Sequence, residues 1–232
     1  MSKPTTRFDV PFFVKNLWED DSVIVAGKSP ELMLTDLRDG IARFGGPWRE
    51  PSYMHAYIKA ADLLVNQALH IRNLDDLGLP IFYLQRHAME LLLKRLLHWF
   101  VELAELKRRN TGKQEVHPTN GEIRRFKTSH DLLELWEDLV NLSLHFGHER
   151  LPDEIKLFID LAVPFEKSNT WSRYAASRSK TTSIRHIDSE IQLPVVRLQR
   201  SLVDAVSFAI SKNGFDNAYE CELYKEWCLY QY

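Results

Sequence analysis

The chain has 232 residues, of which 44% are hydrophobic and 27% are charged, values typical of a folded chain that buries a core. Its formal net charge of −2 excludes a general attraction to nucleic acid, so any such attraction has to come from local basic clusters. Two cysteines, Cys221 and Cys228, are too few for a disulfide scaffold. The sequence has neither the apolar core of a signal peptide nor a run of about 18 apolar residues. We therefore expect a cytoplasmic protein that does not span a membrane, and no cofactor is expected.

The first segment, residues 1–50, differs from the rest because it mixes aromatic residues with proline and glycine. A short β-type run at residues 22–26 precedes a predicted helix over residues 30–44. Ser29 is a favourable N-cap for this helix, and the Gly-Gly-Pro triplet at residues 45–47 is expected to end it. We interpret residues 1–50 as an N-terminal arm packed on the main domain.

The main domain, residues 51–212, is predicted to be an all-α bundle. Apolar residues at three- and four-residue spacing predict helices over residues 52–73, 80–109, 128–146, 152–165 and 193–212. The run 80–109 is the longest, and we expect the other helices to pack against it. Residues 75–80 are expected to turn the chain into this run.

Two stretches, residues 110–127 and 167–186, are expected to be irregular. After the first, Thr128 and Asp131 fit a capping box, which would start the next helix at this point. His130 would then lie in the first turn of that helix, and residues before Thr128 would lie in a loop.

The last segment, residues 213–232, is a tail rich in aromatic residues. Asn213 and Gly214 are expected to stop the preceding helix. Because the tail contains several Tyr side chains and Trp227, we expect it to dock on an apolar surface.

The central run carries two apolar stripes. The broader one is assigned to the core and comprises Ile81, Leu84, Ala88, Leu91, Leu92, Leu96, Trp99, Leu103 and Leu106. The narrower one comprises Phe82, Leu93, Leu97 and Phe100. An exposed apolar stripe of this size usually marks an interface. We therefore expect a homodimer that forms through the second stripe.

Polar side chains follow the same run at a spacing of three and four residues, namely Tyr83, His87, Glu90, Lys94 and His98. This spacing places them on one helix face, and Glu90 before Lys94 is the favourable order for an ion pair. One interpretation is a solvated or inter-helix polar face. The alternative is a divalent-metal site that uses His87 and Glu90, as in a metal-dependent hydrolase, and it needs further ligands from elsewhere in the fold.

Two stretches are rich in basic residues. The first contains Lys107, Arg108, Arg109, Lys113, Arg124, Arg125 and Lys127. The second, residues 167–186, has no acidic residue, and its basic and aromatic side chains include Arg173, Arg178, Lys180, Trp171 and Tyr174. Basic residues neutralise phosphates and aromatic rings stack on unpaired bases, so these five are candidates for binding single-stranded RNA. The alternative is a solvated loop.

The pattern with the clearest chemistry joins an arginine to His130, as Arg–x4–His from Arg125 or Arg–x5–His from Arg124. Metal-free RNA cleavage needs an acid or base with a pKa near neutral for the 2′-hydroxyl proton, and a cation for the phosphorane. At a helix start the dipole favours the neutral imidazole, and hence a base. The alternative is a surface arginine next to a histidine at a helix start.

Four stretches together resemble the HEPN superfamily of helical-bundle proteins: AADLLVNQAL, RHAMELLLKRLL, KTSHDLLELW and SRYAASR. The resemblance covers roughly residues 52–212 and implies an all-α, dimeric protein. Many members are metal-independent ribonucleases of toxin–antitoxin, phage-defence or RNA-processing systems, with an Arg–x4–6–His motif at the dimer interface. On this resemblance Arg125 or Arg124 and His130 are the catalytic candidates. Other members lack a working motif and serve as binding or regulatory modules.

We therefore expect an HEPN-like RNA-binding protein that acts as a metal-independent endoribonuclease in a defence or toxin setting. The alternatives are a non-catalytic helical module for a protein or nucleotide partner, and the metal-dependent hydrolase.

Overall fold

The computed structural model describes residues 29–44, 52–112, 117–148, 150–166, 176–178, 183–185, 187, 189–210 and 217–230. Within these ranges the fold is a helical bundle with one short β-hairpin, and the all-α class that the sequence predicts is confirmed. The helices are α1 (Pro30–Asp39), α2 (Tyr53–His70), α3 (Asp75–Thr111), α4 (Asn120–Thr128), α5 (Leu132–Phe146), α6 (Asp153–Ala162), α7 (Val195–Ala209) and α8 (Tyr219–Leu229). A 3₁₀ turn, η2 (Val163–Phe165), follows α6, and strand β1 (Ala176–Arg178) pairs antiparallel with β2 (Ser183–Arg185). In the described part of the chain, no helix is both long and apolar enough to cross a membrane.

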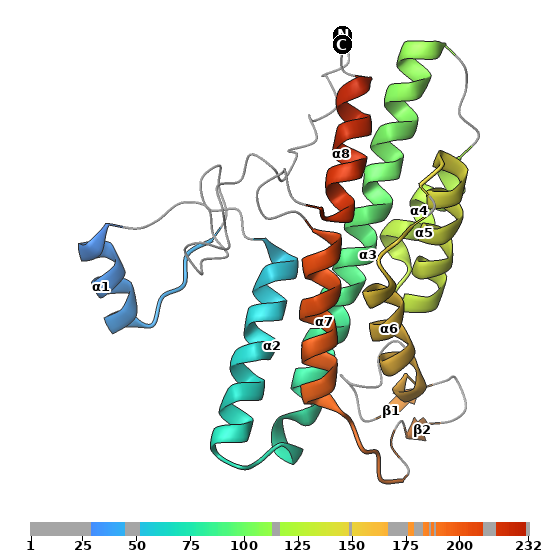
Figure 1. Ribbon diagram of the computed structural model, residues 1–232. Helices are drawn as coiled ribbons and strands as arrows, with labels where there is room; N and C mark the ends of the chain where they lie inside the picture. Colours follow the sequence, from blue (N-terminus) through green and yellow to red (C-terminus); the bar gives the residue numbers. More distant parts are fainter. Residues whose placement is uncertain are drawn as a thin grey trace.

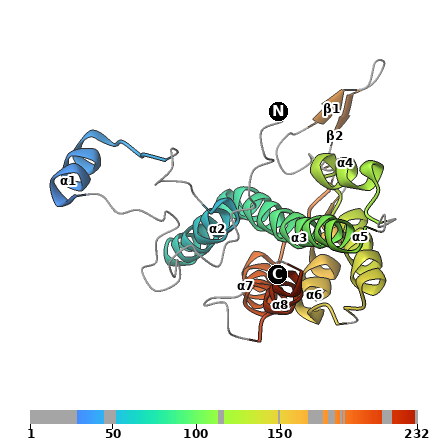
Figure 2. The same ribbon diagram turned by 90° about the horizontal axis from the view of Figure 1, so that it is seen from above.

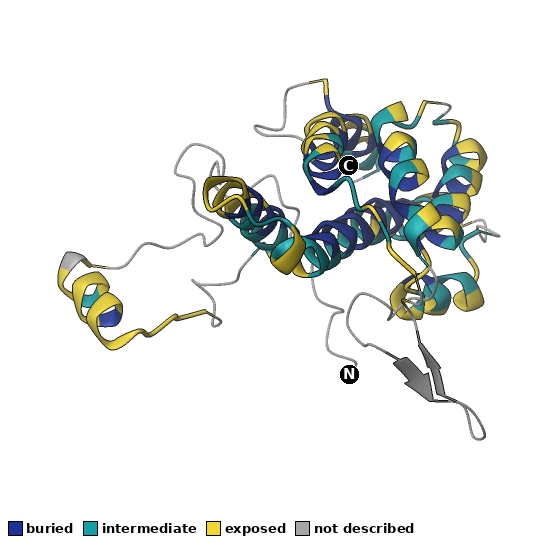
Figure 3. Ribbon diagram, turned by 90° about the horizontal axis from the view of Figure 1, so that it is seen from below, coloured by how far each residue is buried: buried dark blue, intermediate teal, exposed yellow. Residues whose placement is uncertain are grey.

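The long helix α3 organises the bundle (Figure 1). It is 37 residues long and contacts α2, α4, α5, α7 and α8, while α6 packs on α7. Seen from above, α2 and α5 lie on opposite sides of α3, and α7 and α8 lie along the side between them (Figure 2). Buried residues follow α3 along most of its length (Figure 3). The prediction that this run is the centre of the bundle is confirmed.

The second apolar stripe of α3 is part of the core. Phe82, Leu93, Leu97 and Phe100 are all fully buried within a single chain. The ring of Phe82 lies 6.5 Å from that of Phe165 in η2, and other segments of the same chain cover the remainder. The prediction that this stripe is exposed and forms a dimer interface is therefore wrong.

The predicted cap of α1 is confirmed, but its predicted end is not. The hydroxyl of Ser29 accepts a hydrogen bond from the backbone N–H of Leu32 at 3.3 Å. The helix ends at Asp39 because Gly40 adopts the left-handed conformation, with φ of 67°, well before residues 45–47.

The predicted turn at residues 75–80 is also wrong, because these residues are the first turns of α3. The side chain of Asn73 accepts a hydrogen bond from the backbone N–H of Asp76 at 3.3 Å and so supports the start of the helix. Pro80 is the sixth residue of the helix, where it cannot donate the usual backbone hydrogen bond to the carbonyl of Asp76.

The segment before Thr128 contains α4, although the sequence favoured an irregular structure there. Thr119 and Glu122 form a reciprocal capping box, with hydrogen bonds of 3.2 and 2.6 Å. Asp131 caps α5 in place of Thr128, because its carboxylate accepts hydrogen bonds from the backbone N–H groups of Leu133 and Glu134 at 2.9 and 3.1 Å. His130 therefore lies in the connection between α4 and α5, and not in the first turn of a helix.

The aromatic C-terminal segment forms α8, which packs on α3. Buried Glu220 accepts hydrogen bonds from Arg95 Nε and from Trp99 Nε1, each at 2.8 Å. The preceding helix α7 ends at Ala209, and the predicted stop at residues 213–214 lies outside the described residues.

Within the N-terminal arm the structure describes residues 29–44, which include helix α1. This helix lies apart from the other helices (Figure 1), and its apolar side chains Leu34 and Leu37 are exposed. Residues 1–28 and 45–50, including the predicted β-type run at 22–26, lie outside the described residues.

Candidate functional site

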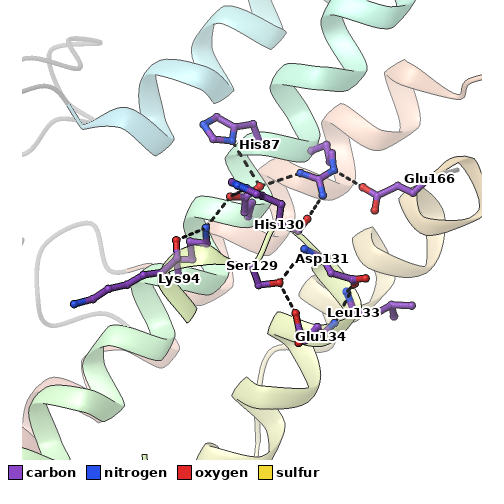
Figure 4. A network of polar contacts seen from close by, with 11 residues as sticks. His87, Lys94, Ser129, His130, Asp131, Leu133, Glu134 and Glu166 are labelled. Atoms are coloured by element: carbon purple, nitrogen blue, oxygen red, sulfur yellow. Dashed lines mark hydrogen bonds and ion pairs between the residues drawn. The ribbon is translucent and has the colours of Figure 1, made fainter. Parts of the chain in front are cut away.

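A buried carboxylate, Glu90 of α3, is the centre of a polar cluster, and Figure 4 shows this cluster with Lys94 and His130 labelled. Its side chain is only 2% exposed, and it accepts three hydrogen bonds. Arg86 Nη1 donates to Oε2 at 2.9 Å, Lys94 Nζ donates to Oε1 at 2.9 Å, and His130 Nδ1 lies 2.9 Å from Oε1. A buried carboxylate needs such partners, since an isolated one would be neutralised by protonation.

The cluster keeps Glu90 ionised. Burial by itself raises the pKa of Glu90, but the favourable interactions with His87, Lys94 and His130 outweigh it and hold that pKa well below its usual range. A carboxylate only accepts hydrogen bonds, so Nδ1 of His130 is the ring nitrogen that carries a proton. The other nitrogen, Nε2, is then the atom with a free lone pair in the neutral ring. The imidazole is 54% exposed, so a ligand can approach it.

Arg86 connects three segments of the chain beneath this histidine. Its side chain is 5% exposed and bonds to Glu90 through Nη1, to Glu166 after η2 through Nε, and to the backbone carbonyl of His130 through Nη2. Burial raises the pKa of Glu166, and Arg86 opposes this rise. Arg86 thus fixes the α4–α5 connection to α3, but it is too deeply buried to meet a ligand.

Sequence reasoning missed Arg86. The predicted polar row contains residues 83, 87, 90, 94 and 98, and Arg86 lies just beside that row. A usable signal was present, because Arg86 stands four residues before Glu90, a spacing at which opposite charges on a helix can pair.

The remaining members of the predicted polar row surround Glu90 to different degrees. Lys94 also donates to the backbone carbonyl of Lys127 at 3.4 Å, and His87 Nδ1 lies 3.8 Å from Glu90 Oε2. His98 is exposed on the next turn and is not among the groups that bond to Glu90. The polar row and His130, which the sequence analysis treated as separate candidates, therefore both contact the carboxylate of Glu90.

The two catalytic arginine candidates are placed differently. Arg125, on α4, donates from Nε to Asp138 of α5 at 2.9 Å and lies 3.6 Å from Glu134. The hydrogen bond to Asp138 raises the pKa of Arg125, so the guanidinium stays charged. Arg124 is exposed on α4. Among the described contacts, neither arginine bonds to His130.

Part of the first basic stretch pairs with acidic neighbours, and Lys113 lies outside the described residues. Lys107 pairs with Glu226 at 2.7 Å, and Arg108 and Arg109 both pair with Glu105 at 2.8 Å.

The second basic stretch is described only in part. Arg173, Lys180, Trp171 and Tyr174 lie outside the described residues, and only the backbone of Arg178, at the end of β1, is described. Their assignment to RNA binding stays a prediction.

The described residues do not favour the metal-site alternative. Both oxygens of Glu90 already accept hydrogen bonds from basic side chains, which would repel a further cation. Within the described ranges, no group of three or more His, Cys, Asp or Glu side chains is arranged to hold a metal ion.

Comparisons of the chain with protein-family models, with curated proteins and with solved structures found no match. The interpretation of the site therefore depends on its own chemistry, an exposed histidine oriented by a buried carboxylate with a lysine alongside.

Proposed function

We propose that the chain is an HEPN-like RNA-binding protein that acts as a metal-independent endoribonuclease. The observation that carries the proposal is the pairing of His130 Nδ1 with Glu90 Oε1 at 2.9 Å, below a half-exposed imidazole. A carboxylate that holds one ring nitrogen orients the other toward a substrate and stabilises the imidazolium that forms.

In the proposed reaction, Nε2 of His130 takes the proton of a ribose 2′-hydroxyl as its oxygen attacks the neighbouring phosphorus. The bond from phosphorus to the 5′-oxygen breaks, and that oxygen takes up a proton, which leaves a cyclic phosphate and a free 5′-hydroxyl. Lys94 Nζ contacts the same oxygen of Glu90 as His130 and retains some exposure, and we assign it to the developing phosphorane charge. Arg125 keeps its structural partner Asp138 in this scheme.

A dimer and a defence or toxin setting follow from the resemblance alone. In a dimer, the histidine of a second copy would supply the proton to the leaving oxygen. This part of the proposal does not depend on the second apolar stripe of α3.

A non-catalytic helical module is the second candidate, and the burial of Arg86, Glu90 and Glu166 favours it. A buried polar network that joins three segments can serve to fix the fold alone. In this case His130 would complete the network and perform no chemistry.

The deciding experiment is a cleavage assay on single-stranded RNA in excess EDTA. His130→Ala is expected to lower the cleavage rate by about 10²- to 10⁴-fold, the usual loss for a positioned acid–base group. Glu90→Gln is expected to lower it as well, since an amide cannot stabilise the imidazolium. His70→Ala, which changes an exposed histidine at the end of α2, is the matched control and should leave the rate unchanged.

Each other outcome has a defined meaning. Wild-type protein that cleaves no RNA favours the non-catalytic module. Cleavage that EDTA abolishes favours the metal-dependent hydrolase.

A further inference from the structure

A group of aromatic rings from α2 and α3 lies beside the cluster around Glu90. The rings of Tyr83 and His87 are parallel within 3°, with centroids 5.8 Å apart. Tyr57 of α2 meets His87 nearly at a right angle, with ring centroids 4.5 Å apart. We call these three residues the aromatic group.

This aromatic group and His130 adjoin the same carboxylate. His87 Nδ1 lies 3.8 Å from Glu90 Oε2, while His130 Nδ1 bonds to Oε1 of the same side chain. Figure 4 shows the side chains of His87 and His130 close to each other beside α3. A ligand held at the aromatic group would therefore be next to the imidazole of His130.

The rings of the group differ from the core aromatics of α3. Phe82, Trp99 and Phe100 are fully buried, whereas the side chain of His87 is 24% exposed and both tyrosines are only partly buried. Tyr57 also packs against the main core, so the group extends from that core to the partly exposed ring of His87. The aromatic group keeps surface that a planar ligand can cover.

We propose that the aromatic group is a base-stacking subsite for single-stranded RNA, a step that rests on the proposed function and extends it to the substrate. Attack by a 2′-hydroxyl requires the nucleotides at the cleaved bond to leave regular stacking. Proteins hold such unstacked bases on aromatic side chains, and each stacked base contributes to affinity with little regard to sequence. The subsite therefore selects unpaired RNA over duplex.

The test uses the full chain and a short 2′-O-methyl RNA strand of about ten nucleotides, with 2-aminopurine at one internal position. The blocked 2′-oxygen prevents cleavage, and stacking on an aromatic ring quenches the fluorescence of 2-aminopurine. Wild-type protein is expected to bind the strand and to quench its fluorescence. Tyr83→Leu and His87→Leu are expected to lose the quenching and to weaken binding by about 5- to 160-fold, the equivalent of one stacked base.

Two controls separate ring stacking from damage to the fold. Tyr83→Phe keeps the ring and should keep the quenching. Tyr53→Leu removes a tyrosine of α2 that is 61% exposed and lies outside the aromatic group, so it should match the wild type.

The subsite is rejected if wild-type protein fails to bind the strand, or binds it without quenching. It is also rejected if both leucine variants match Tyr53→Leu. If His130-dependent cleavage of unmodified RNA persists in that case, the proposed ribonuclease stands without the subsite. Quenching that depends on Tyr83, in a protein that cleaves nothing, keeps the subsite and rejects the ribonuclease.

Discussion

Glu90 shows how much can depend on one side chain, since it partners Arg86, Lys94 and His130 at once. Removing it would leave the buried guanidinium of Arg86 with Glu166 as its remaining carboxylate partner among the described contacts. We expect Glu90→Ala to lower the free energy of unfolding by about 3 kcal/mol, the lower end for breaking a buried ion pair. Urea denaturation followed by circular dichroism measures this change.

Glu105→Ala is the matched control, because Glu105 lies on the same helix and pairs with Arg108 and Arg109 at the surface. Its loss is expected to stay within about 0.5 kcal/mol. Equal losses for the two variants would show that the partners of Glu90 contribute no more than a surface pair.

At the scale of single residues, the sequence predicted which residues belong to the site better than it predicted which of them contact one another. The spacing of His87, Glu90 and Lys94 was readable, because neighbours on a helix face follow from its 3.6-residue period. The bond between Glu90 and His130 was not, because it joins residues 40 positions apart, and only the packing of α3 against the α4–α5 connection brings them together.

At the scale of elements, Arg125 and Asp138 connect α4 to α5. Arg125→Ala is expected to lower the free energy of unfolding by about 1 kcal/mol, a value reduced because the guanidinium is partly exposed. Backbone amides of α4 should exchange faster with solvent, since few other bonds fix this short helix. Hydrogen exchange measured by mass spectrometry tests this expectation, with Arg124→Ala as the exposed neighbour for comparison.

The opposite outcome would support Arg125 as a phosphate contact. In that case Arg125→Ala would weaken RNA binding and cleavage without any change in the exchange of α4.

Most elements followed from the sequence, and the errors have specific physical causes. The glycine and proline residues between positions 112 and 121 favoured an irregular structure, and the Thr119–Glu122 capping box that starts α4 was not recognised. Pro80 suggested a helix start, although Asp75 and Asp76 already occupy the first turn of α3. Periodicity identifies the apolar faces of a helix, but it does not say whether the same chain or a second copy covers each face.

For the whole molecule, the second apolar stripe of α3 is buried within one chain, so a substitution there should affect folding stability and not dimer formation. Leu97→Ala is expected to open a cavity and to lower the free energy of unfolding by about 2–5 kcal/mol. Because the side chain packs within its own chain, this loss should not depend on protein concentration. Denaturation at several concentrations, with sedimentation on the same samples, measures both quantities.

Leu144→Ala on α5 is the matched control, since that leucine is exposed, and its effect should stay within about 0.5 kcal/mol. A destabilisation by Leu97→Ala that disappears at high protein concentration would instead point to a subunit interface at this stripe.

Helix α3 bonds to the α4–α5 connection and to α8 through different residues, and these two sets of contacts restrict changes in its length. Glu90 faces the α4–α5 connection, while Arg95 and Trp99 bond to Glu220 of α8. Inserting or deleting one residue between Glu90 and Arg95 would rotate one set of side chains by about 100° relative to the other, so both could not keep their partners. Length variation among natural homologues should therefore fall in the connections between helices and spare this interval of α3.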